Sequence, residues 1–141
     1  MNNPLVISAT LENMEPLMAH GRDAAAACGM DTKTIAQVEL ALEEVLVNVI
    51  NYAYGPDQDH ASGDIELDCS CDSGKSLILT VTDQGPAFDP LERPDPDTTL
   101  SVEERGIGGL GIFLAKQMMD SVSYRRSQGK NILTLVKNSA G

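Results

Sequence analysis

The stretch DIELDCSCDSGKSLILTVTD, from Asp64 to Asp83, decides the fold class. Its first half alternates apolar and polar side chains, which is the period-two pattern of a half-buried strand; the apolar members are Ile65, Leu67, Cys69 and Cys71. Residues 72–75, Asp-Ser-Gly-Lys, indicate a turn, and residues 76–82 alternate again. The stretch therefore predicts an antiparallel hairpin with strands over 64–72 and 76–82.

The flanking sequence predicts helices on the N-terminal side and a second hairpin on the C-terminal side. Before the hairpin we expect a strand over 4–9, a helix over 12–28 that Thr10 caps and Gly29 ends, and a helix from Asp31-Thr32 to about residue 53. After it come a loop over 83–107, a helix over 112–119, and strands over 122–127 and 131–136 around the turn Gln128-Gly129. The order β-α-α-β-β-loop-α-β-β predicts an α/β (α+β) two-layer sandwich, a largely antiparallel mixed sheet with helices on one face.

Length and charge limit the class of protein. The 141 residues, 42% apolar and 22% charged, predict one domain over 1–141. Ten Lys and Arg against 21 Asp and Glu give a net charge of −11, and so acidic a surface argues against direct nucleic-acid or membrane-surface binding. Any bound phosphate must then be held by backbone amides, a metal ion or a few local cations.

The cysteines and the N-terminus indicate the compartment. Cys28, Cys69 and Cys71 are an odd number and form neither a Cys-x-x-Cys pair nor a cluster with histidine, so all three are predicted to be reduced core residues. Residues 1–9 lack a signal-peptide pattern, and no window approaches a membrane span. The expected location is the cytoplasm.

The long helix from Asp31 carries polar residues in an apolar setting. At about 100° per residue, Glu44, Asn48 and Asn51 fall within an arc of about 60°, with Leu40 and Val47 on one side and Ala41 on the other. A buried carboxylate needs an ion pair, hydrogen bonds or a metal. The alternative is a surface helix whose arc is solvated, with Glu39 and Glu43 marking its solvated edge.

Two glycine-containing motifs follow. Asp83-Gln84-Gly85 comes directly after a strand, where the carboxylate can accept a hydrogen bond from an exocyclic amine, although such triplets are often ordinary turns. Residues 106–111, Gly-Ile-Gly-Gly-Leu-Gly, precede a helix, and free amides at a helix N-terminus bind phosphate. Arg105 and Lys116 are the available cations. The motif is neither a Walker loop nor a Rossmann fingerprint, and a flexible hinge is the alternative.

Together these motifs resemble the nucleotide-binding boxes of the GHKL superfamily, which contains gyrase-type, heat-shock chaperone, histidine kinase and mismatch-repair ATPases. The matching residues are Glu44-x-x-x-Asn48, Asp83-x-Gly85 and Gly108-Gly-Leu-Gly111. The chain is most similar to the anti-sigma factor serine kinases of bacterial stress and sporulation switches, over roughly residues 35–137. The resemblance implies a Bergerat or histidine-kinase-like ATPase fold.

The resemblance also implies roles for individual residues. Glu44 would be the catalytic base, and Asn48 would ligate Mg²⁺ bridging the phosphates of ATP. Asp83 would accept a hydrogen bond from the adenine amino group. Gly85 would leave room for the ring, and residues 101–106 would form part of a lid over 84–107. The remaining implied nucleotide-binding residues are Asn51, Ala87, Arg105, Gly106, Gly108, Gly109, Leu110, Gly111 and Thr134.

The sequence departs from the family at two places. Tyr52 stands where a histidine often follows the metal-binding asparagine by four residues. Near Gly129 the family commonly has a hydroxyl residue, whereas Lys130 and Asn131 follow here and Thr134 is the available substitute.

Three functions are consistent with these features. The first is a Mg-ATP-dependent anti-sigma serine/threonine-protein kinase that phosphorylates an anti-sigma antagonist and binds a sigma factor or similar regulator. The second is an ATP-binding partner-switching module with little or no kinase activity, which the two departures favour. The third is a nucleotide-free interaction domain. In similar proteins the first helix contributes to dimerisation, so a homodimer is expected.

Overall fold

The computed structural model describes residues 4–52, 63–72, 75–85 and 109–138. Strand β1 (Leu5–Ser8) leads through the 3-10 helix η1 (Leu11–Asn13) into α1 (Met14–Ala27) and α2 (Thr32–Tyr52). Strands β2 (Asp64–Asp72) and β3 (Ser76–Asp83) form the central hairpin, and α4 (Gly109–Met118), β4 (Ser121–Ser127) and β5 (Lys130–Asn138) complete the chain order. The predicted order of elements is confirmed, although α4 begins at Gly109 rather than at residue 112.

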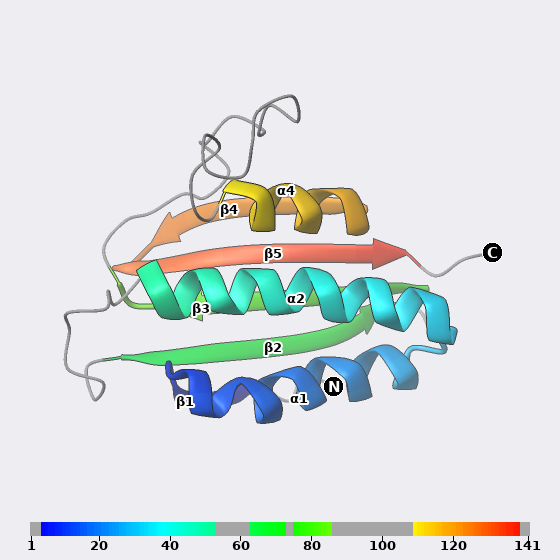
Figure 1. Ribbon diagram of the computed structural model, residues 1–141, viewed down its shortest axis with the longest axis horizontal. Helices are drawn as coiled ribbons and strands as arrows, with labels where there is room; N and C mark the ends of the chain where they lie inside the picture. Colours follow the sequence, from blue (N-terminus) through cyan, green and yellow to red (C-terminus); the bar gives the residue numbers. More distant parts are fainter. Residues whose placement is uncertain (1–3, 53–62, 73–74, 86–108, 139–141) are drawn as a thin grey trace.

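In the described residues, the strands form one sheet with α1, α2 and α4 on one of its faces (Figure 1). The strand order is β1-β2-β3-β5-β4, and each neighbouring pair in the described residues is antiparallel. The sheet is therefore antiparallel throughout these residues rather than mixed. Helix α2 lies between α1 and α4 and runs along the strands over the middle of the sheet (Figure 1). The two-layer architecture is the predicted one.

The helix ends have different local causes. Asp31 caps α2, because its Oδ1 accepts a hydrogen bond from the Thr34 backbone N–H over 2.8 Å. Gly29 follows the end of α1 with a φ of 81°, a conformation that glycine adopts without steric cost. The Thr10 side chain makes no capping hydrogen bond; only its carbonyl accepts, from the Asn13 N–H over 3.0 Å. The prediction of a Thr10 side-chain cap is therefore wrong.

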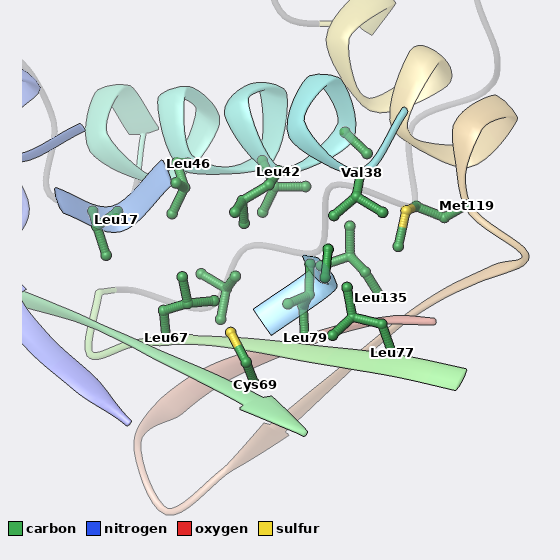
Figure 2. Close-up of a cluster of buried hydrophobic side chains, with 14 of the residues drawn as sticks. Leu17, Val38, Leu42, Leu46, Leu67, Cys69, Leu77, Leu79, Met119 and Leu135 are labelled. Atoms are coloured by element: carbon green, nitrogen blue, oxygen red, sulfur yellow. The ribbon is translucent and has the colours of Figure 1, made fainter. Parts of the chain in front are cut away.

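The core lies between the helices and the sheet (Figure 2). Leu42 and Leu46 of α2 and Leu17 of α1 point toward Leu67, Leu77, Leu79 and Leu135 of the strands, and all seven side chains are at most 1% exposed. Buried residues alternate with less buried ones over 65–70 of β2, all of β3 and 131–136 of β5. Each strand therefore has one face in the core and one face away from the helices.

The cysteines correct the sequence prediction. Cys28 and Cys71 form a disulfide, with their Cα atoms 5.6 Å apart, and Cys69 is a buried free thiol. Cys71 follows Cys69 by two residues on the helix-facing side of β2, where Cys28 at the end of α1 meets it. The two partners are 43 residues apart in sequence, so spacing alone did not reveal the pair. The prediction that all three cysteines are reduced is wrong for Cys28 and Cys71.

The closing hairpin brings the start of β5 beside the end of β3. Gln128 and Gly129 have φ values of 52° and 76°, as a tight two-residue turn requires. This turn joins β4 to β5, and β5 pairs with β3 so that Asn131 stands opposite Asp83. In the described part of the chain, none of the helices combines the length and the apolar character needed to cross a membrane.

Candidate functional site

The predicted motifs lie at one end of the molecule. In Figure 1 the end of β3, the start of β5, the C-terminal half of α2 and the start of α4 all lie toward the left edge. These elements carry Asp83, Asn131, Asn48 and Gly109 respectively. Antiparallel pairing of β3 with β5 requires the end of one to meet the start of the other. The topology thus gathers three sequence motifs that are far apart in the chain.

Asp83 is a buried carboxylate on the helix-facing side of the sheet. It ends the alternation Leu77, Leu79, Val81 and is 5% exposed. Its Oδ1 accepts hydrogen bonds from the Gly85 backbone N–H and from the Asn131 Nδ2, each over 2.9 Å. Both of these bonds use Oδ1, and Oδ2 takes part in neither. The Asp-x-Gly triplet is therefore a turn that also fixes the direction of a buried carboxylate.

Three residues of the closing hairpin support this carboxylate. Asn131, also 5% exposed, accepts hydrogen bonds at Oδ1 from the Tyr124 hydroxyl over 2.6 Å and from Arg126 Nη1 over 3.1 Å. Arg126 Nη1 also donates to the Gly85 carbonyl over 2.7 Å. Sequence reasoning treated Asn131 as a departure from the family and did not select Tyr124 or Arg126. The available signal was Asn131 itself, a polar residue in phase with the core residues Leu133 and Leu135.

The predicted polar arc of α2 faces away from α1. Glu39 is not simply solvated as predicted, because it accepts a hydrogen bond from Arg22 Nε of α1 over 3.3 Å. At 100° per residue, Glu44 and Asn48 lie about 140° and 180° around the helix from Glu39. They therefore lie on the side of α2 where α4 packs (Figure 1). Both residues are half-buried, so the arc is neither fully solvated nor enclosed.

The glycine-rich motif is described from Gly109 onward. Residues 109–111 form the first turn of α4, where backbone N–H groups lack partners within the helix. Lys116 lies in the last turn, about 10 Å along the helix from Gly109. The structure therefore places Lys116 away from the start of α4, where a phosphate would bind.

Thr134 is not brought to this site. It pairs with Thr80, and Asn131 pairs with Asp83. Because side chains alternate along a strand, Thr134 and Asp83 lie on opposite faces of the sheet. The residue that stands beside Asp83 is Asn131.

The other predicted site residues lie outside the described residues. These are Ala87, Arg105, Gly106 and Gly108, together with the lid over 84–107 beyond Gly85. Asn51 belongs to α2 and Leu110 to α4, and the side chains of both lie outside the described part of the structure.

The described residues fit a nucleotide with Mg²⁺ better than a metal held by protein alone. In the described ranges, no three His, Cys, Asp or Glu side chains gather into a metal cluster. Asn48 offers an amide oxygen, and Mg²⁺ is commonly held by one or two protein oxygens together with substrate phosphates. Asp83 offers a buried acceptor for an amine.

Comparison with known proteins defines the class of the chain. A family model described as the histidine kinase-like ATPase domain matches residues 7–137. The chain belongs to this family, and the resemblance to the GHKL superfamily and its anti-sigma serine kinases is confirmed.

Particular relatives are named as kinases. The chain is 32% identical over 101 residues to the serine/threonine-protein kinase BtrW of Bordetella bronchiseptica, covering 72% of this chain and 68% of that protein. It is 29% identical over 110 residues to the serine-protein kinase RsbW of Oceanobacillus iheyensis, covering 74% of this chain and 66% of that protein. The chain thus spans about two thirds of these relatives.

Solved structures show the same fold. The RsbU and RsbW domains of Rv1364c from Mycobacterium tuberculosis superpose with a TM-score of 0.64 at 19% identity, covering 99% of this chain and 33% of that one. The histidine kinase domain of a blue-light activated kinase from Erythrobacter litoralis gives a TM-score of 0.54 at 21% identity, covering 93% and 61% of the two chains.

Proposed function

We propose that this protein is a Mg-ATP-dependent serine/threonine-protein kinase that phosphorylates an anti-sigma antagonist and binds a sigma factor or a similar regulator. The observation that carries the proposal is the buried Asp83 carboxylate, held at Oδ1 by Gly85 and Asn131 at the end of the domain where α2 and α4 meet. The relatives named as serine-protein kinases support it.

In this proposal each element supplies one function. Oδ2 of Asp83 accepts a hydrogen bond from the amino group of adenine, and backbone amides at the start of α4 hold phosphate. Asn48 ligates Mg²⁺, which would neutralise phosphate charge during transfer. Glu44, one helical turn before Asn48 on the same side of α2, orients or deprotonates the attacking hydroxyl of the protein substrate. Phosphoryl transfer depends mainly on positioning and charge, so a site with few catalytic side chains suffices.

A partner-switching module that binds ATP without transferring phosphate is the second candidate. The two departures from the family pattern, Tyr52 and Asn131, favour it. In that case ATP would gate the exchange of partners.

Under either candidate function, the protein is proposed to be a homodimer that acts in the cytoplasm, where disulfides such as Cys28–Cys71 are uncommon. Its activity should therefore be measured in both reduced and oxidised forms.

Calorimetric titration with ATP and Mg²⁺ tests the nucleotide site. We expect saturable binding by the wild type and loss of binding in Asp83→Asn, which replaces an acceptor oxygen by a donor. Asp72→Asn, at the last residue of β2, is a matched control on the same sheet and should bind ATP normally. If the wild type binds no ATP, the proposal fails.

Phosphate transfer separates the two candidates. With Mg-ATP and a cognate antagonist protein, the wild type should label a serine or threonine of that protein. Glu44→Gln should bind ATP but lose transfer by about a hundredfold or more, whereas Glu43→Gln, on the solvated side of the helix, should retain it. Partner exchange that depends on ATP but is unaffected in Glu44→Gln would instead support the switching module.

A further inference from the structure

The side-chain amide of Asn131 is held in one orientation. Its Oδ1 faces two groups, the Tyr124 hydroxyl at 2.6 Å and Arg126 Nη1 at 3.1 Å. A guanidinium has hydrogen-bond donors and no acceptor, so the atom that faces Arg126 must be the carbonyl oxygen. The amide NH₂ is thereby turned toward Asp83, 2.9 Å from Oδ1.

The same arginine also fixes the turn after β3. Arg126 Nη1 donates to the Gly85 carbonyl over 2.7 Å, and the Gly85 N–H donates to Asp83 Oδ1 over 2.9 Å. Asp83 Oδ1 is therefore held from two directions by groups that Arg126 orients. Because Asp83 and Asn131 are each 5% exposed, water does not readily replace these bonds.

We propose that Tyr124, Arg126 and Asn131 of the closing hairpin form a positioning unit that makes Asp83 selective for a 6-aminopurine nucleotide. This inference rests on the proposed function and deepens it. The unit occupies Oδ1 with donors and leaves the other oxygen as a directed acceptor. A nucleotide with an amino group at position 6 matches this acceptor, and one without that group loses a hydrogen bond to a charged oxygen.

Comparing two nucleotides isolates this role from a general effect on stability. The probes are ATP and purine riboside triphosphate, which is ATP without its 6-amino group, each titrated calorimetrically with Mg²⁺ into the full chain. The wild type should prefer ATP by about tenfold to a hundredfold, the range for a hydrogen bond to a charged group. The ratio of the two dissociation constants is the readout.

Variants of Asn131 test the unit directly. Asn131→Asp keeps the shape but turns an oxygen toward Asp83, so we expect the two nucleotides to bind alike. Asn131→Thr keeps a donor and should recover part of the preference for ATP. Asn138→Asp makes the same chemical change at the exposed far end of β5 and should keep the wild-type ratio.

A double variant tests the orientation of the amide while leaving Asp83 and Asn131 in place. Tyr124→Phe with Arg126→Met removes both donors to Asn131 Oδ1, and the preference for ATP should fall. A thermal melt shows whether Asn131→Asp is folded, and if it is not, the double variant alone tests the positioning unit.

The outcomes separate the two proposals. If the wild type binds neither nucleotide, the proposed function is overturned together with this inference. If the wild type prefers ATP but Asn131→Asp and the double variant weaken both nucleotides equally and keep the ratio, the positioning role is overturned while the proposed function stands.

Discussion

Cys28, the residue after α1, is disulfide-bonded to Cys71 near the end of β2, with the two Cα atoms 5.6 Å apart. The bond ties the helical layer to the sheet, and the loop that it closes contains all of α2. The candidate site residues Glu44 and Asn48 therefore lie on a helix inside the loop that the disulfide closes.

Reducing this disulfide should destabilise the protein. A crosslink between residues 43 apart lowers the entropy of the unfolded chain, and the loop-length relation gives about 4 kcal/mol. We expect the urea midpoint to fall in the presence of a reductant and to be equally low in Cys28→Ser/Cys71→Ser.

Thiol counting provides the control. Under denaturing conditions without reductant, one thiol, Cys69, should react in the wild type. The double variant should melt identically with and without reductant. Wild-type protein that unfolds at the same urea concentration in both conditions would contradict the stabilising role.

Most of the fold could be predicted because its signals are local. The alternation over 64–83, the Asp31 cap and the turn at Gln128-Gly129 each report on neighbouring residues. The disulfide could not be predicted, since it depends on where the end of α1 meets β2 in space. The prediction of a Thr10 side-chain cap was wrong because sequence gives the type of the capping residue but not the direction of its side chain.

Cys69 should make stability depend on alkaline pH. Burial, and then the nearby charge of Asp68, raise the pKa of the Cys69 thiol from 9.0 to about 12. Between these values the folded chain keeps a proton that the unfolded chain loses, so stability should fall as pH rises from 9.0 toward 12. Urea unfolding in the Cys28→Ser/Cys71→Ser background should show a steeper decline with Cys69 present than with Cys69→Ala. Equal slopes would rule out this contribution.

Asp31 should make the stability of the fold depend on pH in the acidic range, where stability falls as the pH falls. Hydrogen bonds from the Thr34 side chain and then from its backbone N–H lower the pKa of Asp31 below 3.8. The stabilisation is thus present above pH 3.8 and is lost as pH falls through the lowered pKa. Asp31→Ala should lower the Tm at neutral pH, whereas Asp31→Asn keeps a capping oxygen without this titration. A difference between wild type and Asp31→Asn that does not change with pH would contradict the assignment.

Gly21 permits the close packing of α1 on α2. A Cβ at this position would lie 2.5 Å from Leu42 Cδ2. Leu42 is 1% exposed, so its side chain or helix α1 must shift to admit the added atom. We expect Gly21→Val to cost about 1–3 kcal/mol in urea unfolding. Ala26→Val, on the exposed side of α1, should cost about half a kcal/mol from helix propensity alone. Because valine has a higher helix propensity than glycine, a Gly21→Val variant as stable as the wild type or more stable would show that the contact is readily relieved.

The candidate site was only partly predictable. Asp83 and Gly85 were found because a polar triplet directly after a strand is a local signal, and Glu44 and Asn48 because helical spacing places them on one side. Their partners Tyr124, Arg126 and Asn131 lie on the closing hairpin and reach Asp83 only through the pairing of β3 with β5. Strand register, which sequence does not give residue by residue, decided between Asn131 and Thr134.

Thr134 and Asn131 should therefore respond differently to substitution. Thr134 pairs with Thr80 on the face away from the helices, so Thr134→Val should leave the calorimetric affinity for ATP unchanged. Asn131→Ala removes a donor to Asp83 Oδ1 and should weaken ATP binding by about tenfold. Thermal melts of both variants establish that they are folded before titration. Weakened binding in Thr134→Val with normal binding in Asn131→Ala would mean that a hydroxyl from β5, and not the amide, serves the nucleotide site.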